Sequence, residues 1–503
     1  MDIFDIYKPL RNWVAQLDLQ DALYVVWAHS QFLQVRGFQL PDDIEVNRLV
    51  MQAPQLRKAC SEWELEFLAK ELVINCAPTA RGSKSIREWK SFANTINHLR
   101  AFEDRVFERV GPEADIQIEI LRIAHRQFSW QVERPNKASI ARYYRIFSDT
   151  LIDQICVERL GIPVRHIYAL GLALIGHYSK EFSYNLPFSS SLENISDASC
   201  AAFLAFSSRH FDLLRTNLRS QQSYDERFIY SYNDLRAFPL IQMAYRGRHS
   251  LVCPIPTLLF WRITSGLYYE LVFDERFANP FGAAFQKYVG EVIRRGTAGT
   301  TAKFYSEHVY GSVKSDRKLS ADWIIADSNS AIFVECKAKR LTWSAKSALS
   351  DPTPFRRDCD ELASAVVQLY RTILDYQKNQ YEFLQYSKHR EVFPVVCTLE
   401  NWHLLGPRAR KILDDLVKAK LVVAGLPKSL PDEMPFSIMP VAAMETTAQA
   451  IRIFGIRDLF RGKMLDAERR EWAWDTYLHS VPGYSQPSGF LFDDALDEIA
   501  HGM

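Results

Sequence analysis

The sequence has few of the features that identify many protein classes. Eight cysteines are spread over 503 residues, with no Cys-x-x-Cys pair and no Cys/His cluster at zinc-ligand spacing. This pattern argues against a disulfide scaffold and fits reduced thiols in a cytosol. The most apolar run, HIYALGLALIGHY from residue 166, is too short to span a bilayer. The first residues, MDIFDIYKPLRNW, contain no apolar signal core. We therefore expect a soluble, cytoplasmic protein that does not enter a membrane.

An excess of charge of one sign is also missing. The chain has 61 basic and 60 acidic residues, a formal net charge of +1, so its overall charge indicates no class of partner. Its hydrophobic residues make up 48% of the sequence and its aromatic residues 13%, which is the composition of a folded globular protein. The length predicts about two to four domains.

Hydrophobic periodicity divides the chain into four parts. Residues 1–235 contain one helical pattern after another and predict a mostly helical domain for recognition or regulation. Residues 236–275 predict a connector with two strands around a turn at Gly247. Residues 276–447 predict a helix, three strands, a helix, a strand, a helix and a strand, which is an α/β (α+β) sheet domain covered by helices. Residues 448–503 predict a helical tail.

The third part contains an irregular stretch and a long helix. Residues 342–358, TWSAKSALSDPTPFRRD, have two prolines and many small polar residues, so they predict a mobile loop. The stretch that follows, DELASAVVQLYRTILDYQ, predicts a helix. Its apolar stripe is formed by Leu362, Val366, Leu369 and Ile373.

The chemically specific part of the chain is the predicted hairpin ADWIIADSNSAIFVECKAKRL, residues 321–341. If its turn is centred between Ser328 and Asn329, Asp322 lies opposite Glu335, with the Cβ atoms roughly 5 Å apart. Strand alternation places Lys337 on the same face as Glu335. Two opposed carboxylates repel each other unless a positive charge lies between them. Magnesium, which prefers hard oxygen ligands, supplies that charge with Lys337 beside it.

This hairpin resembles the active site of the PD-(D/E)xK nucleases, also called the restriction-endonuclease-like superfamily. The resemblance covers about residues 275–445 and implies a helix-flanked sheet with the active carboxylates on its central hairpin. It also implies hydrolysis of phosphodiester bonds with Mg²⁺, for which Mn²⁺ can substitute. By this resemblance Asp322, Glu335 and the main-chain carbonyl of Cys336 hold the metal. Lys337 orients the attacking water and stabilises negative charge on the phosphate.

The predicted leading helix departs from the pattern of this superfamily. Where many members have an acid after Gly-x-x-Phe, this chain has Gln286, and Glu291 follows five residues later. The sequence leaves open which of the two completes the metal site. Gln368 and His308 are auxiliary candidates, and His308 is expected to be structural or to contact phosphate rather than to bind metal.

Basic residues are concentrated around the hairpin. Between Arg276 and Ser347 there are twelve Lys or Arg residues and six Asp or Glu residues. Such an excess attracts nucleic acid without specifying its sequence. The expected nucleic-acid contacts are Lys303, Lys314, Arg317, Lys318, Lys339, Arg340, Lys346, Arg356 and Arg357.

Together these features predict a magnesium-dependent endonuclease. DNA is favoured over RNA as the substrate, and by analogy the setting is bacterial restriction or defence against phage. The helical N-terminal region is expected to bind the substrate or an activating partner protein. Two alternatives stay open. One is a nucleic-acid-binding or assembly subunit of a defence complex with little catalysis, which the missing acid at Gln286 favours. The other is a nuclease for RNA or branched junctions on the same fold.

Overall fold

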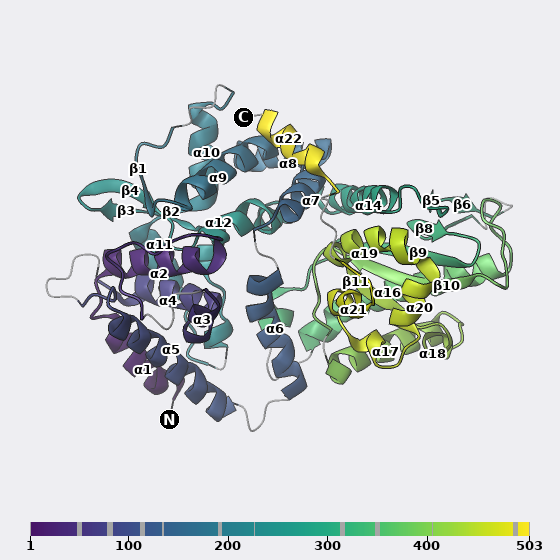
Figure 1. Cartoon of the computed structure of the whole chain (residues 1–503), viewed down its shortest axis with the longest axis horizontal. Coiled ribbons are helices and arrows are strands. Elements are labelled where there is room, and N and C mark those ends of the chain that lie inside the picture. The colour runs from purple at the N-terminus through teal and green to yellow at the C-terminus, as the bar shows by residue number, and fades with distance from the viewer. Residues whose placement is uncertain are drawn as a thin grey trace. The chain divides into compact units, whose positions relative to one another are not determined.

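The protein is described by a computed structural model that covers residues 2–47, 53–77, 84–110, 116–132, 135–189, 194–225, 227–311, 317–347, 353–404, 406–485 and 491–501 (Figure 1). The chain divides into two compact units. The N-terminal unit comprises residues 1–115, 123–277 and 494–503, and the C-terminal unit comprises residues 116–122 and 278–493. Their boundary at residue 277 lies close to the boundary expected from the sequence. No helix within the described ranges has the length and apolar character needed to cross a membrane.

The N-terminal unit is mostly helical, as its sequence predicts. Its helices are α1 (Ile3–Val14), α2 (Leu19–Gln34), α3 (Ala53–Ala59), α4 (Glu62–Asn75), α5 (Trp89–Val110), most of α6 (Ile116–Val132), α7 (Lys137–Phe147), α8 (Thr150–Leu160), α9 (Val164–Tyr178), α10 (Asp197–Ser207), α11 (Phe211–Ser220), α12 (Pro256–Ile263), α13 (Tyr268–Leu271) and α22 (Asp493–His501). Its strands are β1 (Ser183–Asn185), β2 (Ser208–His210), β3 (Leu240–Tyr245) and β4 (Arg248–Val252).

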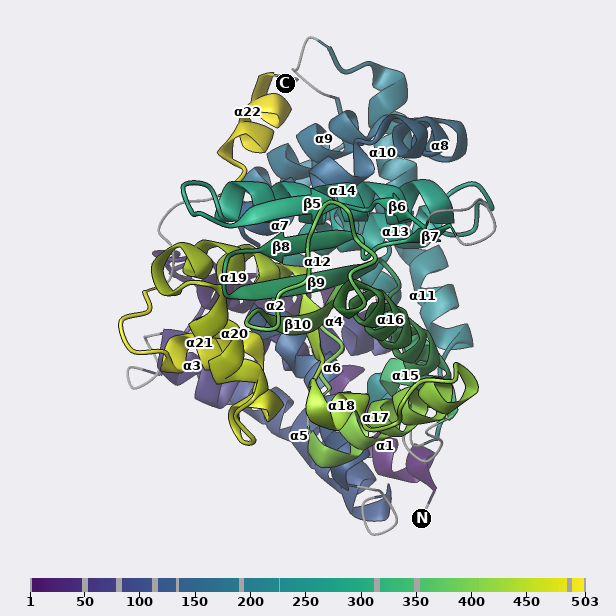
Figure 2. The same ribbon diagram turned by 90° about the vertical axis from the view of Figure 1, so that its right-hand side faces the viewer.

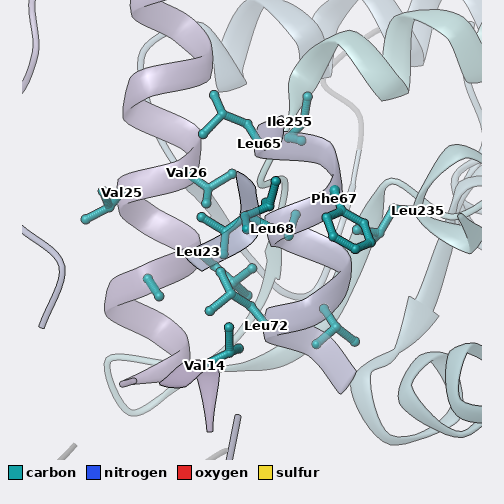
Figure 3. Packing of buried hydrophobic residues seen from close by; sticks show 14 of the residues in the cluster. Val14, Leu23, Val25, Val26, Leu65, Phe67, Leu68, Leu72, Leu235 and Ile255 are labelled. Atoms are coloured by element: carbon teal, nitrogen blue, oxygen red, sulfur yellow. The ribbon is translucent and has the colours of Figure 1, made fainter. Parts of the chain in front are cut away.

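Helix α4 lies at the centre of this unit. A capping box begins it, because the Glu64 side chain accepts a hydrogen bond from the Ser61 backbone N–H at 2.7 Å. Almost all of its residues are buried, and Figure 3 shows Leu68 and Leu72 packed against Leu23 of α2. A helix that is buried on every side needs neighbours all around it, which explains why so many helices surround this one.

The strands of the N-terminal unit form one sheet in the order β1-β4-β3-β2. The predicted hairpin at Gly247 is present, and Arg246 and Gly247 both have positive φ, 49° and 78°, as a tight two-residue hairpin turn requires. Because β3 and β4 pair with strands from within residues 1–235, residues 236–275 do not form a separate connector. The sequence pattern did not reveal the three-residue strands β1 and β2.

The C-terminal unit has the element order that its sequence predicts, with a few additions. It contains α14 (Ala278–Gly296), β5 (Lys303–Ser306), β6 (Val309–Tyr310), β7 (Lys318–Leu319), β8 (Trp323–Ala326), β9 (Ser330–Lys337), α15 (Trp343–Ser347), α16 (Thr353–Gln377), β10 (Glu391–Thr398), α17 (Gly406–Val423), α18 (Leu430–Glu433), β11 (Ser437–Pro440), α19 (Val441–Phe454), α20 (Ile456–Met464) and α21 (Trp474–Ser480).

Five of these strands form a mixed sheet in the order β11-β10-β9-β8-β5, and Figure 2 shows β5, β8, β9 and β10 in this sequence. Strand β10 is parallel to β9 and β11, whereas β8 is antiparallel to β9 and β5. Ile324, Ala331 and Phe333 share a buried cluster with α16 and α17 on one face. The other face packs on α14 and α20, where Trp323 contacts Gly290 and Phe393 contacts Phe460. The result is a helix-covered α+β unit.

Two sequence-based expectations about this unit are wrong. Residues 342–358 are not one loop, because α15 covers 343–347 and α16 begins at Thr353; residues 348–352 lie outside the described part of the chain. Residues 448–503 are not a separate tail. Trp474 donates a hydrogen bond to Ser437 Oγ of β11 at 2.9 Å, so this part of the chain completes the C-terminal unit, and only its last helix belongs to the N-terminal unit.

Residue 290 of α14 has to be glycine, because the Trp323 ring packs where a larger side chain would begin. A Cβ atom at residue 290 would lie 2.0 Å from the Trp323 ring. We expect Gly290→Ala to lower the free energy of unfolding by about 1–3 kcal/mol, because overpacking outweighs the gain in helix propensity. Urea unfolding of the purified chain measures this change.

Gly282 of the same helix provides a matched control. A Cβ atom there would meet nothing within 4 Å, so Gly282→Ala should stabilise the protein by about 0.5–1 kcal/mol. Equal stabilisation by the two substitutions would show that Trp323 does not pack on Gly290.

Candidate active site

The hairpin of β8 and β9 has the predicted register. Trp323 lies opposite Val334 and Ala326 lies opposite Ala331, so the next pair in this register is Asp322 and Glu335. The turn fixes the register, because Asp327 Oδ1 accepts hydrogen bonds from the backbone N–H groups of Asn329 at 2.8 Å and Ser330 at 2.7 Å. Asp322 and Glu335 therefore lie side by side across two strands, as the sequence predicts.

Asp322 occupies the position where β8 stops pairing with β9. Its Oδ2 atom accepts a hydrogen bond of 2.7 Å from the backbone N–H of Cys336. The N–H and C=O groups of one strand residue point toward the same neighbouring strand, so the Cys336 carbonyl also points to the side of Asp322. Asp322 is only 9% exposed, and its burial raises the pKa of the carboxyl group, although the bond from Cys336 and the charge of Lys337 oppose this shift.

Glu335 is more deeply buried than Asp322, with 2% of its surface exposed. Its Oε1 atom accepts a hydrogen bond of 2.9 Å from Lys337 Nζ, whereas its Oε2 atom has no hydrogen-bond partner. Burial, followed by repulsion from Asp322, raises the pKa of Glu335 to about 7, and Lys337 acts in the opposite direction. A buried oxygen without a partner is costly, so this atom is ready to bind a cation.

Lys337 carries the positive charge of the site. Burial acts to lower the pKa of its ammonium group, but the Glu335 carboxylate and then Asp322 outweigh this effect and the pKa lies above its ordinary value. This shift favours the protonated ammonium group of Lys337. One third of its side chain is exposed, which leaves the ammonium accessible to a substrate.

The residues of this site fit a magnesium ion. Asp322, Glu335 and the Cys336 carbonyl offer hard oxygen atoms, and Oε2 of Glu335 lacks a partner. Magnesium commonly takes one or two protein carboxylates and completes its shell with water. Within the described ranges, no three His, Cys, Asp or Glu side chains lie close enough together to hold a metal. The acidic side chains that are already in place to bind a metal are therefore the two carboxylates of Asp322 and Glu335.

A third acid, Glu307, was not identified from the sequence. Ser306 lies opposite Trp323, but three residues later Val309 lies opposite Leu319, so residues 307–308 face the longer stretch 320–322. One extra residue on one strand is a β-bulge, a feature that re-aims side chains near active sites. The register of β5 and β8, continued by one pair beyond Ser306 and Trp323, places Glu307 beside Asp322. Burial, followed by the Asp322 charge, raises the pKa of Glu307, and Glu307 in turn contributes to the raised pKa of Glu335.

The structure does not bring the two expected helix residues to the carboxylates. Gln286 and Glu291 belong to α14, which packs on the face of the sheet that carries Trp323; the Gln286 carbonyl accepts a hydrogen bond from Trp323 Nε1 at 2.9 Å. Asp322 contacts Cys336 and lies near Lys337, and no group of α14 is among those that shift its pKa.

The auxiliary candidates are placed differently from each other. Gln368 is exposed on α16, in the same stripe as the exposed Glu361 and Ser364, and so points away from the sheet. His308 directly follows Glu307, and its ring stacks on Phe383 with the centroids 4.4 Å apart. Its backbone N–H donates a hydrogen bond to Ser320 Oγ at 2.9 Å. His308 therefore packs against Phe383, and a contact of His308 with phosphate stays a prediction.

The predicted nucleic-acid contacts fall into two groups. Four of them form ion pairs with acidic residues: Lys318 with Asp375, Lys339 with Glu361, and both Arg340 and Lys346 with Glu400. Four others are exposed and have no ion pair among the described residues: Lys303, Arg317, Arg356 and Arg357. Lys314 lies outside the described residues. Contact of the exposed group with phosphate stays a prediction.

The raised pKa of Glu335 predicts how stability changes with pH in the metal-free protein. The unfolded chain loses this proton near pH 4.3, whereas the folded protein keeps it until about pH 7. The raised pKa of Glu335 therefore contributes its full stabilisation of the fold below pH 4.3, and this stabilisation is lost as the pH rises through 7. Glu335→Gln cannot titrate, so between pH 4.5 and 8 the wild type should lose about 3 kcal/mol of stability relative to this variant.

Glu382→Gln is the matched control, because Glu382 is exposed in the same unit and loses the same charge. Urea unfolding across this pH range, in the presence of a chelator, should give parallel curves for the control and the wild type. A Glu335→Gln curve that also runs parallel to the wild type would mean that Glu335 ionises normally.

Comparison with protein-family models, curated proteins and solved structures found no match to this chain. The interpretation of the site therefore depends on its own residues and their geometry.

Proposed function

We propose that the C-terminal unit is a magnesium-dependent endonuclease that hydrolyses phosphodiester bonds. The observation that carries this proposal is the buried Glu335 carboxylate opposite Asp322, with one oxygen on Lys337 and the other without a partner. An acid in this position destabilises the fold unless a cation binds, and such an arrangement is more common at a functional site than in a structural core. The resemblance of Asp322, Glu335 and Lys337 to the PD-(D/E)xK pattern points to the same chemistry.

Each residue of the site has a separate task in this proposal. Asp322, Glu335 and the Cys336 carbonyl would hold Mg²⁺, which neutralises charge on the phosphate and acidifies a bound water. Lys337 remains protonated and donates hydrogen bonds to a phosphate oxygen, where negative charge increases during the reaction. The hydrogen bond from Cys336 to Asp322 keeps that carboxylate in place before substrate arrives.

The substrate is a nucleic acid, with DNA favoured by the superfamily resemblance. Arg356 and Arg357 lie at the start of α16, which is joined to the end of the hairpin: the Asp358 carboxylate accepts a hydrogen bond from the Thr342 backbone N–H at 2.8 Å. Their exposed guanidinium groups suit phosphate contacts near Lys337. We further propose that the N-terminal unit binds the substrate or an activating protein, and that the enzyme restricts foreign DNA in a bacterial cytoplasm.

A second candidate function is nucleic-acid binding with weak catalysis. It is favoured by the absence, within the described ranges, of three side chains that converge on a metal. Cleavage of single-stranded, double-stranded and branched DNA and RNA, measured with Mg²⁺ and with Mn²⁺, separates the candidates. Binding without cleavage under all of these conditions would favour the second candidate.

Removal of any one site residue should abolish cleavage. We expect Asp322→Asn, Glu335→Gln and Lys337→Ala each to reduce the cleavage rate by at least about a hundredfold, a loss of about 3 kcal/mol or more of transition-state stabilisation. Without metal, the melting temperatures of Asp322→Asn and Glu335→Gln should stay equal to that of the wild type or rise, because the repulsion between the two carboxylates is relieved. Lys337→Ala should instead lower the melting temperature, because it removes the charge that opposes this repulsion. Glu382→Gln should cleave normally. A folded Glu335→Gln protein with full activity would refute the site.

The exposed arginines should contribute affinity without sequence preference. The double variant Arg356→Ala/Arg357→Ala should bind DNA more weakly, and the slope of log affinity against log salt should decrease by about 1–2. The control is Lys378→Ala/Lys388→Ala, which removes two exposed charges from the same unit at the far end of α16 and before β10. Fluorescence anisotropy at several salt concentrations measures both slopes. If the two double variants have equal slopes, Arg356 and Arg357 do not contact phosphate.

A further inference from the structure

Three acidic residues on three neighbouring strands lie in one row of the C-terminal sheet. Strand β5 ends at Ser306 opposite Trp323, and Trp323 lies opposite Val334 of β9. The next row of the same register contains Glu307 directly after β5, Asp322 directly before β8, and Glu335 of β9; these strands are adjacent in the order β5, β8, β9. The row of carboxylates is therefore built by strand pairing, with Asp322 in the middle.

The charge in this row is not balanced by the protein. Lys337 is bonded to Glu335 Oε1, and the second oxygen of Glu335 has no partner although it is buried. Asp322 is neutralised only in part, by a backbone N–H. Glu307 has no hydrogen bond or ion pair within the described part of the chain. Three carboxylates with one ammonium group leave a local excess of negative charge that a divalent cation compensates.

We propose that Glu307 is the third acidic group of the divalent-cation site, in place of an acid from the leading helix. This inference rests on the proposed nuclease function and adds a ligand to the same site. The register of β5 and β8 brings Glu307 beside Asp322, because Glu307 and Asp322 are the next pair after Ser306 and Trp323. Glu291 is not among the charged groups that shift the pKa of Asp322 or Glu335, whereas Glu307 acts on Glu335.

Glu307 is also the acid in the row that is free to adjust. Asp322 and Glu335 are buried and fixed by hydrogen bonds, whereas the Glu307 side chain is exposed and unbonded. The three side chains do not meet at one point in the structure, so Glu307 turns toward the ion when the ion binds. A rotation of an exposed glutamate about its side-chain bonds needs no backbone movement.

Manganese binding to the full-length protein tests the proposal without measuring cleavage. Free Mn²⁺ is followed by electron paramagnetic resonance for the wild type, Asp322→Asn, Glu307→Gln, Glu307→Asp, Glu291→Gln and Glu382→Gln. We expect Glu307→Gln to weaken Mn²⁺ binding roughly tenfold or more. Glu307→Asp, which keeps the charge, should retain more affinity, and Glu291→Gln and Glu382→Gln should bind like the wild type. Thermal unfolding without metal confirms that each variant is folded.

The outcomes separate this proposal from the proposed function. If Asp322→Asn abolishes binding while Glu307→Gln binds like the wild type, Glu307 is not a ligand and the nuclease proposal stands. If Glu291→Gln weakens binding and Glu307→Gln does not, the leading helix provides the third acid. If the wild-type protein binds no Mn²⁺, both the metal-dependent function and the role of Glu307 are wrong.

Discussion

The repulsion between Asp322 and Glu335 is the interaction on which the candidate site depends. Both carboxylates are buried at the end of a sheet, and the protein supplies one ammonium group and one backbone N–H against them. Water cannot compensate the remaining charge, because Glu335 is almost completely enclosed. Without a metal, the protein therefore tends to protonate Glu335. Under the proposed function a divalent cation would replace that proton, and stability and activity would be linked through the same pair of side chains.

The rest of the C-terminal unit holds this unfavourable pair in place. The Asp327 turn sets the hairpin register, and Trp323 anchors β8 to α14 by packing on Gly290 and bonding to the Gln286 carbonyl. After β9, the chain is held by Glu400, which accepts hydrogen bonds from the Leu341 backbone N–H at 2.7 Å and from Arg340 and Lys346. Several of the basic residues near the site thus have a structural task.

Two buried acids of the N-terminal unit are each paired with an arginine. Glu64 and Glu66 of α4 each lie against an arginine, Arg100 and Arg236, which reaches both carboxylate oxygens. Such bidentate pairs satisfy the buried charge inside the protein, so these acids need no further ligand. The unpartnered oxygen of Glu335 contrasts with these two pairs, although Glu71 of α4 is also buried and also has one oxygen without a partner.

The sequence by itself determined the hairpin, its register and the trio Asp322, Glu335 and Lys337, because strand alternation and turn chemistry are local properties. It also determined the order of elements in the C-terminal unit. Only the tertiary structure decided that Glu307 lies beside Asp322 and that α14 covers the other face. The first depends on pairing between β5 and β8, and the second on which side of the sheet the leading helix packs. Neither property is encoded in residue spacing, since both join segments that are distant along the chain.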